Sequence, residues 1–147
     1  NLLNINMDEN ELLEKAINNF KNDSIVKLNS LKISNNKKRI LSDLDLDKSE
    51  IKNFLNKLMD YRYIDEISDL ETGNYIRWIS IKEGVDKIKL TTGGIVVSIE
   101  IEEDGVHIKC KNRYNAIFEL MLDENLIFQK LTNQEEILLK VIDYLET

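Results

Sequence analysis

The sequence predicts an α+β protein with a helical N-terminal half, a small antiparallel β-sheet and a C-terminal helix. Apolar residues recur at helical spacing up to about Met59. From Ile95 onward they alternate with polar residues, as in strands that face water on one side. With 147 residues, 42% of them hydrophobic, the chain is long enough to bury a core. These observations place helices before strands and strands before the last helix.

Helical signals open the chain. Asp8 followed by Glu11 is typical of a capping box, and the apolar residues after them predict one helical face ending near Asn22. Segment 24–33 suits either a helix or short strands, so both alternatives stay open. The apolar face of this first helix consists of Leu12, Leu13, Ala16, Ile17 and Phe20.

Two further helices are expected before the strands begin. A short one starts at Asn36, and Asp47 or Ser49 can cap the next one. That next helix has the clearest helical spacing in the chain, with apolar positions at Ile51, Phe54, Leu55, Leu58 and Met59. Strands 62–67 and 75–81 then flank a turn-forming run, which predicts a hairpin. The order of two helices and a hairpin is that of a winged helix.

The second half is expected to fold as a meander of short strands. Residues Ile95, Val97, Ile99 and Ile101 are expected on its buried face, and further strands follow at 106–110, 117–122 and 126–130. Together with strand 75–81, five strands and a bend at Gly93 could close into a small barrel of the SH3 or Sm type.

Thr132 and Glu135 form a second capping box, so a terminal helix should start there and cap the sheet. We therefore expect a winged-helix-like domain over 8–82 and a small β domain with the C-terminal helix over 83–147. The strand at 75–81 fits either part, which leaves open whether the two halves share one core.

Composition narrows the classes of function. The formal net charge is −7, and the chain has one cysteine and one histidine, so an intrachain disulfide and a Cys/His zinc site are excluded. No apolar run approaches the length of a membrane span, and no secretory signal is visible. We expect a cytoplasmic, non-enzymatic protein without a cofactor or metal. Because the chain begins at Asn1, we also expect it to be a processed or trimmed product.

Three motifs that resemble functional sites have simpler interpretations. The run from Asp43 to Asp47 lacks the glycine and glutamate that a calcium loop requires. His107 and Cys110 stand three residues apart on a strand, which places them on opposite faces, the cysteine in the core and the histidine at the surface. The acidic residues at 100–104 are expected to form a charged hairpin tip with ordinary pKa values rather than a catalytic pair.

Two surfaces are candidates for binding a protein partner. One is the polar helix face of Lys52, Asn53, Asn56 and Lys57, and the other is strand 75–81 with Tyr75, Arg77 and Trp78, because aromatic and arginine anchors dominate interface energies. The alternative is a nucleic-acid binder that uses Lys37, Lys38, Arg39, Lys52 and Lys57. Residues 1–73 contain 11 basic and 14 acidic side chains, a net charge of −3, so protein docking is favoured.

Two segments also resemble known families. Segment 40–65 resembles the helix-turn-helix and first wing strand of winged-helix regulators, in Ile40-Leu41-Ser42-Asp43-Leu44, Leu46-Asp47-Lys48-Ser49-Glu50-Ile51 and Leu55-x-x-Leu58-Met59-x-x-Arg62-Tyr63-Ile64-Asp65. Segment 69–130 resembles a small β module of uncharacterised proteins from large nucleocytoplasmic DNA viruses. That similarity is in Asp69-Leu70-x-x-Gly73-x-Tyr75-Ile76-Arg77-Trp78-Ile79, Gly93-Gly94 and Leu126-Ile127-Phe128-Gln129-Lys130. It implies a viral origin and an adaptor or assembly role in host cytoplasm or in the virion.

Overall fold

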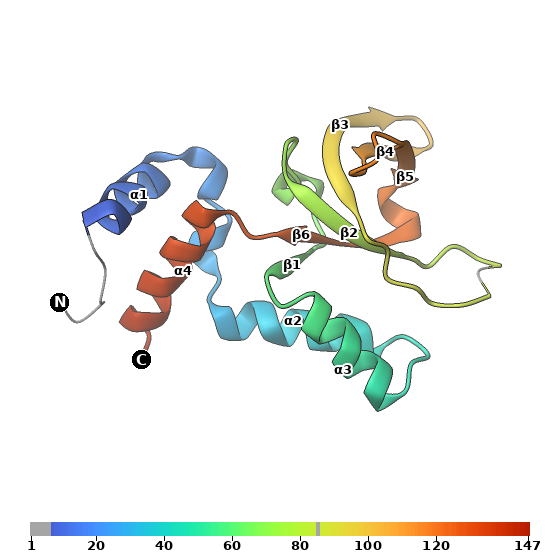
Figure 1. The fold of residues 1–147 in the computed structure, drawn as a ribbon, viewed down its shortest axis with the longest axis horizontal. Helices are drawn as coiled ribbons and strands as arrows, with labels where there is room; N and C mark the ends of the chain where they lie inside the picture. Colours follow the sequence, from blue (N-terminus) through green and yellow to red (C-terminus); the bar gives the residue numbers. More distant parts are fainter. Residues whose placement is uncertain (1–6, 85) are drawn as a thin grey trace. The chain divides into compact units, whose positions relative to one another are not determined.

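The computed structural model describes residues 7–84 and 86–147 and divides them into two compact units (Figure 1). The first contains the described residues up to Asn35 together with Leu131–Thr147, and the second is Asn36–Lys130. The predicted domain boundary after residue 82 falls inside the second unit, between two strands that pair with each other. Among the described residues, no helix is both long and apolar enough to cross a lipid bilayer.

The first unit is helical. It contains α1 (Met7–Asn18), two short 3-10 turns (Phe20–Asn22 and Ile25–Lys27), the start of α2 (Ser30–Ser42), and α4 (Asn133–Leu145). Segment 24–33 thus forms a 3-10 turn and the first turn of α2. The core side chains of this unit are Ala16, Ile25, Ile33, Ile137, Leu138 and Leu139.

One prediction for the first unit needs correction. The first helix ends at Asn18 rather than near Asn22. Phe20 belongs to a separate 3-10 turn and is 77% exposed, and Ile17 is 65% exposed, so neither lies on the buried face of this helix. The capping box of Thr132 and Glu135 is confirmed, and the buried residues of α4 join the core of the helical unit.

The second unit is an open, six-stranded antiparallel sheet with helices on one face. The rest of α2 and α3 (Lys48–Lys57) precede the strands. The strand order is β1-β6-β2-β3-β4-β5, so β1 and β5 are the two edges. The strands are β1 (Tyr61–Ile64), β2 (Tyr75–Ser80), β3 (Gly94–Glu102), β4 (Gly105–Lys111), β5 (Ile117–Met121) and β6 (Asn125–Lys130), with a 3-10 turn, Leu122–Glu124, between the last two.

The predicted hairpin of the first two strands is wrong. Strand β6 lies between β1 and β2 and pairs with both, so they are not neighbours. Strand β6 forms one ladder of hydrogen bonds with β1 and another with β2. Its residues are more than 40 positions away in the sequence, so local patterns around β1 and β2 do not predict this pairing. In place of a wing, the segment between β1 and β2 makes a 3-10 turn, Ile67–Asp69, and Gln129 of β6 bonds to this segment at Asp69 O (3.0 Å) and Glu71 N (3.0 Å).

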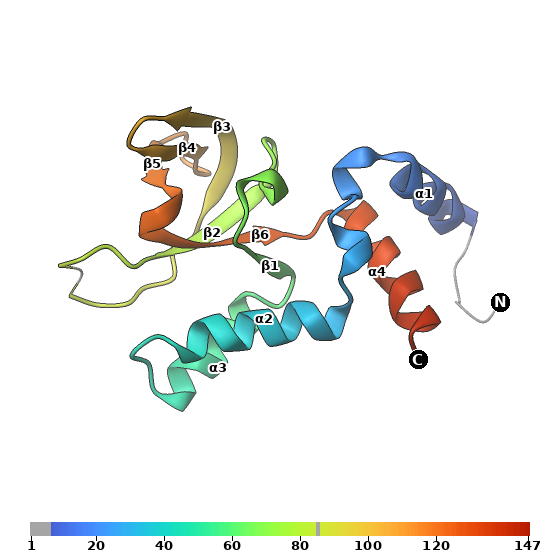
Figure 2. The ribbon, with the colours of Figure 1, turned by 180° about the vertical axis from the view of Figure 1, so that it is seen from behind.

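A β-bulge changes the face predicted for β3. The pairing with β4 shifts between Val96 and Ser98, so Val97 is the extra residue. Val96 is consequently buried, at 1% exposure, whereas Ile95 and Val97 face solvent. The expected buried face of Ile95, Val97, Ile99 and Ile101 is therefore wrong except at Ile99, which packs against the core, because Ile101 is also 77% exposed. Figure 2 shows β3 bending along its length, as bulged strands do.

Two cores lie on opposite faces of this sheet. One is the strand-lined cluster of Ile64, Leu70, Ile76, Val96, Ile108, Cys110, Leu120 and Ile127. The other joins the sheet to α2 and α3 through Leu41, Phe54, Leu58, Tyr61, Ile79, Leu90 and Phe128. Cys110 is buried as predicted, and loss of solvation raises the pKa of its thiol to about 12.

Candidate functional site

The predicted polar face of α3 lies on the surface. Lys52, Asn53, Asn56 and Lys57 are all exposed, whereas Phe54 of the same helix is buried. Asp47 is the N-cap of this helix and forms a capping box with Glu50. The hydrogen bond from the amide of Glu50 (2.8 Å) holds the pKa of the Asp47 carboxyl below its usual value. The four polar side chains are thus held together on one rigid element.

The predicted basic cluster at 37–39 is divided by burial. Lys37 is only 6% exposed, and its Nζ donates to the carbonyls of Leu58 (2.8 Å) and Met59 (3.3 Å) at the end of α3. Desolvation lowers the pKa of Lys37, partly opposed by the charge of Asp60. Lys38 and Arg39 are exposed. Lys37 therefore supports the α3 carboxyl end, whereas the other predicted nucleic-acid contacts face water.

The predicted anchors on β2 do not share a face. Tyr75 and Arg77 lie on the helix side of the sheet, where the hydroxyl of Tyr75 donates to the carbonyl of Thr92 and Arg77 Nε donates to the carbonyl of Thr91 (2.8 Å). Arg77 Nη1 also lies 3.5 Å from the carbonyl of Lys57. Trp78 points to the opposite face, because side chains alternate along a strand.

Trp78 borders a surface hollow of about 480 Å³ beside the end of β5. Its indole also packs edge-on against Phe118 of β5, with ring centroids 6.4 Å apart. Phe118 is 46% exposed although its neighbours on that face are buried. The lining residues are Trp78, Ser80, Lys82, His107, Glu119, Leu120, Met121, Glu124 and Asn125. The hollow thus combines an aromatic wall with two carboxylates.

The outer edge of β5 adjoins this hollow. In the described part of the chain, β5 pairs with β4 on one side and with no strand on the other. The amide of Asn112 donates to the carbonyl of Ala116 (3.0 Å), and hydrogen-bonded pairs in an antiparallel ladder recur every second residue, so Phe118 and Leu120 bond to β4. The backbone groups that point outward therefore belong to Ile117, Glu119 and Met121, and of these the carbonyl of Met121 already accepts a hydrogen bond from Asn125 Nδ2 (2.8 Å).

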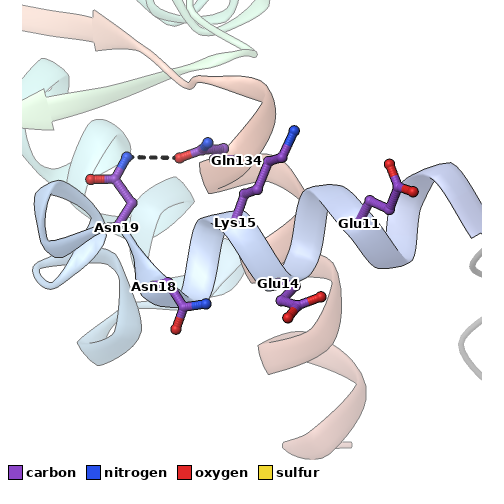
Figure 3. A pocket seen from close by; sticks show the side chains of 6 residues that line it. All are labelled: Glu11, Glu14, Lys15, Asn18, Asn19 and Gln134. Atoms are coloured by element: carbon purple, nitrogen blue, oxygen red, sulfur yellow. Dashed lines mark hydrogen bonds between the residues drawn. The ribbon is translucent and has the colours of Figure 1, made fainter.

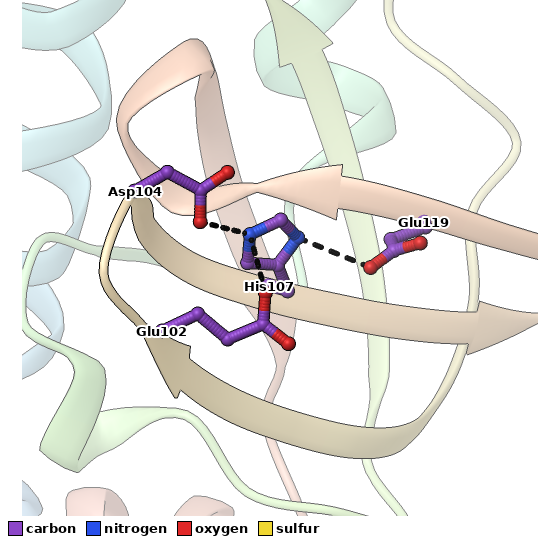
Figure 4. A network of polar contacts seen from close by, with 4 residues as sticks. All are labelled: Glu102, Asp104, His107 and Glu119. Atoms are coloured by element: carbon purple, nitrogen blue, oxygen red, sulfur yellow. Dashed lines mark hydrogen bonds and ion pairs between the residues drawn. The ribbon is translucent and has the colours of Figure 1, made fainter.

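His107 lies at the centre of a carboxylate network (Figure 4). Its Nε2 is 2.7 Å from Asp104 Oδ1 and 3.2 Å from Glu102 Oε2, and its Nδ1 is 3.1 Å from Glu119 Oε1. The hydrogen bond to Asp104 is the main cause that raises the pKa of His107, and the same bond lowers the pKa of Asp104. The side chain of His107 is only 15% exposed, so the predicted surface position is correct only in part. Sequence reasoning missed this network, whose members come from three strands and one turn.

Part of this network has the composition of a cation site. The ligand atoms of Glu102, Asp104 and His107 lie within 4.8 Å of one another. A cation there would compete with the proton on His107, because a coordinating imidazole must be neutral. In the structure, charge-assisted hydrogen bonds and ion pairs of His107 connect β4 to Glu102 of β3 and to Glu119 of β5.

A second hollow, of about 540 Å³, lies in the helical unit (Figure 3). Five residues of the α1 segment, among them Glu11 and Lys15, line it together with Gln134 of α4. The amide of Asn19 donates to Gln134 Oε1 (2.9 Å), which joins α4 to the residue that follows α1. Within the part of the chain that the structure describes, this hollow has no aromatic side chain in its lining and no strand edge beside it, so it is a weaker candidate than the hollow at Trp78.

Comparison with protein-family models, curated proteins and solved structures found no match to this chain. The candidate site is therefore defined by its own geometry. Sequence reasoning named Trp78 and missed the edge of β5, although the alternation over 117–122 indicated a strand there. Whether a strand lies at an edge depends on the order of the strands in the sheet, and the periodicity of the sequence does not predict that order.

Proposed function

We propose that this chain is a non-enzymatic protein-interaction module that binds an extended segment of a partner along the outer edge of β5. The single observation that carries the proposal is the outward-facing backbone of β5 beside the Trp78 hollow. An added strand gains main-chain hydrogen bonds from such an edge, and pockets for alternate side chains give specificity.

The side chains along the edge fit this function. Ile117 and Phe118 are 58% and 46% exposed, so the strand offers apolar contact area on both faces. Trp78 lines the hollow and packs against Phe118, so the two rings supply aromatic surface beside the edge of β5. The exposed face of α3 remains a predicted second contact surface.

We also propose a finer description of the fold. Strands β2–β5 follow one another as a meander, a 3-10 turn follows, and β6 returns to pair with β2, which supports an SH3-like module. The helices α2 and α3 followed by β1 support a winged-helix-like part. A viral origin, and with it an adaptor role in host cytoplasm or in the virion, stays a prediction of the sequence.

The experiment is a random-peptide display screen on the whole chain, repeated on Ile117→Pro. Proline at this position removes an outward-facing amide and leaves the β4 ladder intact, so the fold should survive. The matched control is Ile117→Thr, which shortens the apolar side chain but keeps the amide. We expect peptides that bind the wild type and Ile117→Thr and lose at least tenfold in affinity on Ile117→Pro, since several main-chain hydrogen bonds depend on register.

Circular dichroism and thermal melting check that both variants are folded. A screen that enriches no peptide, or peptides whose affinity is equal for Ile117→Pro and Ile117→Thr, would refute strand addition. Binding of duplex DNA or RNA that weakens steeply with salt would instead support the nucleic-acid hypothesis.

A further inference from the structure

We propose that the partner segment bound at β5 carries a lysine or arginine opposite Glu119 and an apolar side chain that enters the Trp78 hollow. This inference rests on the proposed function and specifies the chemistry of its ligand. It follows from the position of Glu119, from the charges around the hollow, and from the poor match of β5 to a second copy of itself.

Glu119 is the central residue of β5, and its backbone groups point outward. Its side chain is 51% exposed, and one carboxylate oxygen bonds to His107 Nδ1 at 3.1 Å. An ionised carboxylate accepts about four hydrogen bonds, so this bond leaves capacity for another donor. On an added strand, the residue directly opposite would lie about 4.5–5.5 Å from Glu119 between Cβ atoms, within reach of a basic side chain.

The charges around the hollow favour a cation. Glu119 and Glu124 line the hollow. Glu102 and Asp104 contact His107, which also lines it. Lys82, the cation on the opposite rim, is 3.8 Å from Glu124 and therefore already has a carboxylate neighbour. The four carboxylates named above still outnumber the cations when three cations are counted. These are Lys82, a protonated His107, and Lys109, which lies opposite Glu119 on β4. The net charge of −7 draws a basic segment toward the chain at low salt.

A second copy of β5 fits the same edge poorly. Antiparallel pairing of β5 with itself in the register of greatest overlap places Glu119 opposite Glu119. Like charges directly opposite on neighbouring strands are destabilising. Shifting the register by two residues separates the glutamates but shortens a ladder that has five residues at most. The edge is thus better matched to a basic partner than to self-association.

The apolar part of the ligand follows from the lining. Trp78, Leu120 and Met121 contribute the apolar wall of a hollow of about 480 Å³, which is large enough for one side chain of the size of leucine or phenylalanine. Residues two apart share a face of a strand, so the basic residue and the apolar residue of the partner segment need not be neighbours in its sequence. The proposed ligand is therefore a short extended segment that contains both residues.

The test measures peptide affinity by fluorescence anisotropy, using one peptide enriched on the wild-type chain and its variants with Lys, Gln or Glu at the position opposite Glu119. We expect the Lys peptide to bind about threefold tighter than the Gln peptide and about tenfold tighter than the Glu peptide, from the usual size of cross-strand charge pairs. In Glu119→Gln the spread should shrink to within about twofold. The control Glu103→Gln, in the β3–β4 turn, should retain the full spread.

The failures of this inference and of strand addition are distinguishable. Equal affinities of the three peptides, or a spread that persists in Glu119→Gln, would overturn the charge inference, while sensitivity to Ile117→Pro would still uphold strand addition. Binding of all peptides that is insensitive to Ile117→Pro would overturn both. Sedimentation velocity tests whether a second copy of this chain binds the edge. A dimer that dissociates in Ile117→Pro would show that a second copy, rather than a basic segment, occupies the edge.

Discussion

The helix-covered face of the sheet and the β3–β5 end differ in whether their polar groups bond to backbone carbonyls or remain accessible to solvent. On the helix-covered face, Lys37, Tyr75 and Arg77 donate to backbone carbonyls of the same unit. At the β3–β5 end, the carboxylates around His107 are at least half exposed, and the outer edge of β5 has no neighbouring strand among the described residues. Donors that satisfy internal carbonyls stabilise the fold, whereas exposed charges and open backbone are available to a ligand. This contrast is the reason why we propose the β5 edge, rather than strand β2, as the binding site.

The largest expected effect is on the core of the helix-covered face. Phe128 is fully buried between the sheet and the helices and stacks against Tyr63, with ring centroids 5.7 Å apart. Phe128→Ala should lower the free energy of unfolding by about 3–5 kcal/mol, because it removes an aromatic ring and leaves a cavity. Urea denaturation measures the loss. The control is Phe118→Ala at the β5 edge, where the ring is half exposed, and equal losses for the two variants would break the contrast.

A smaller effect is expected at Lys37. Lys37→Ala removes the donor for two carbonyls at the end of α3 and should cost about 1–3 kcal/mol of stability. Lys38→Ala, one residue away and exposed, should stay within about 0.5 kcal/mol. Chemical denaturation of both variants checks this. If Lys38→Ala costs as much as Lys37→Ala, the structural role assigned to Lys37 is wrong.

The smallest effect is a pH dependence at the β3–β5 end. The folded-state pKa of His107 is raised above its ordinary value of 6.5, so its contribution to stability is complete below pH 6.5 and is lost as pH rises through the raised pKa. Asp104 has a lowered pKa, so its contribution is present above its ordinary value of 3.8 and is lost as pH falls through the lowered one.

The carboxylates that face His107 are Glu102, Asp104 and Glu119, and Glu100 is its cross-strand neighbour on β3. The free energy of unfolding of the wild type minus that of His107→Gln should therefore be largest between the two shifted pKa values and decline on either side. A difference that stays constant from pH 4 to pH 9 would contradict the ion-pair network. Glu103→Gln serves as the control for a general charge effect.

Several elements followed from local patterns because their causes are local. The α3 helix with its cap at Asp47 and the capping box of Thr132 and Glu135 depend on neighbours a few residues away. The inward direction of Cys110 follows from the alternation along its own strand. The strands of the meander likewise follow from alternation. These features need no information about distant parts of the chain.

The tertiary structure alone decided the remaining features, because they depend on partners distant in sequence. Strand β6 separates β1 from β2, and the bulge at Val97 exchanges the faces of β3. The burial of Lys37 depends on where α3 ends, and the network of His107 depends on the pairing of β4 with β3 and β5. Periodicity states which side chains share a face, but strand order and register determine what covers that face and which edge stays open.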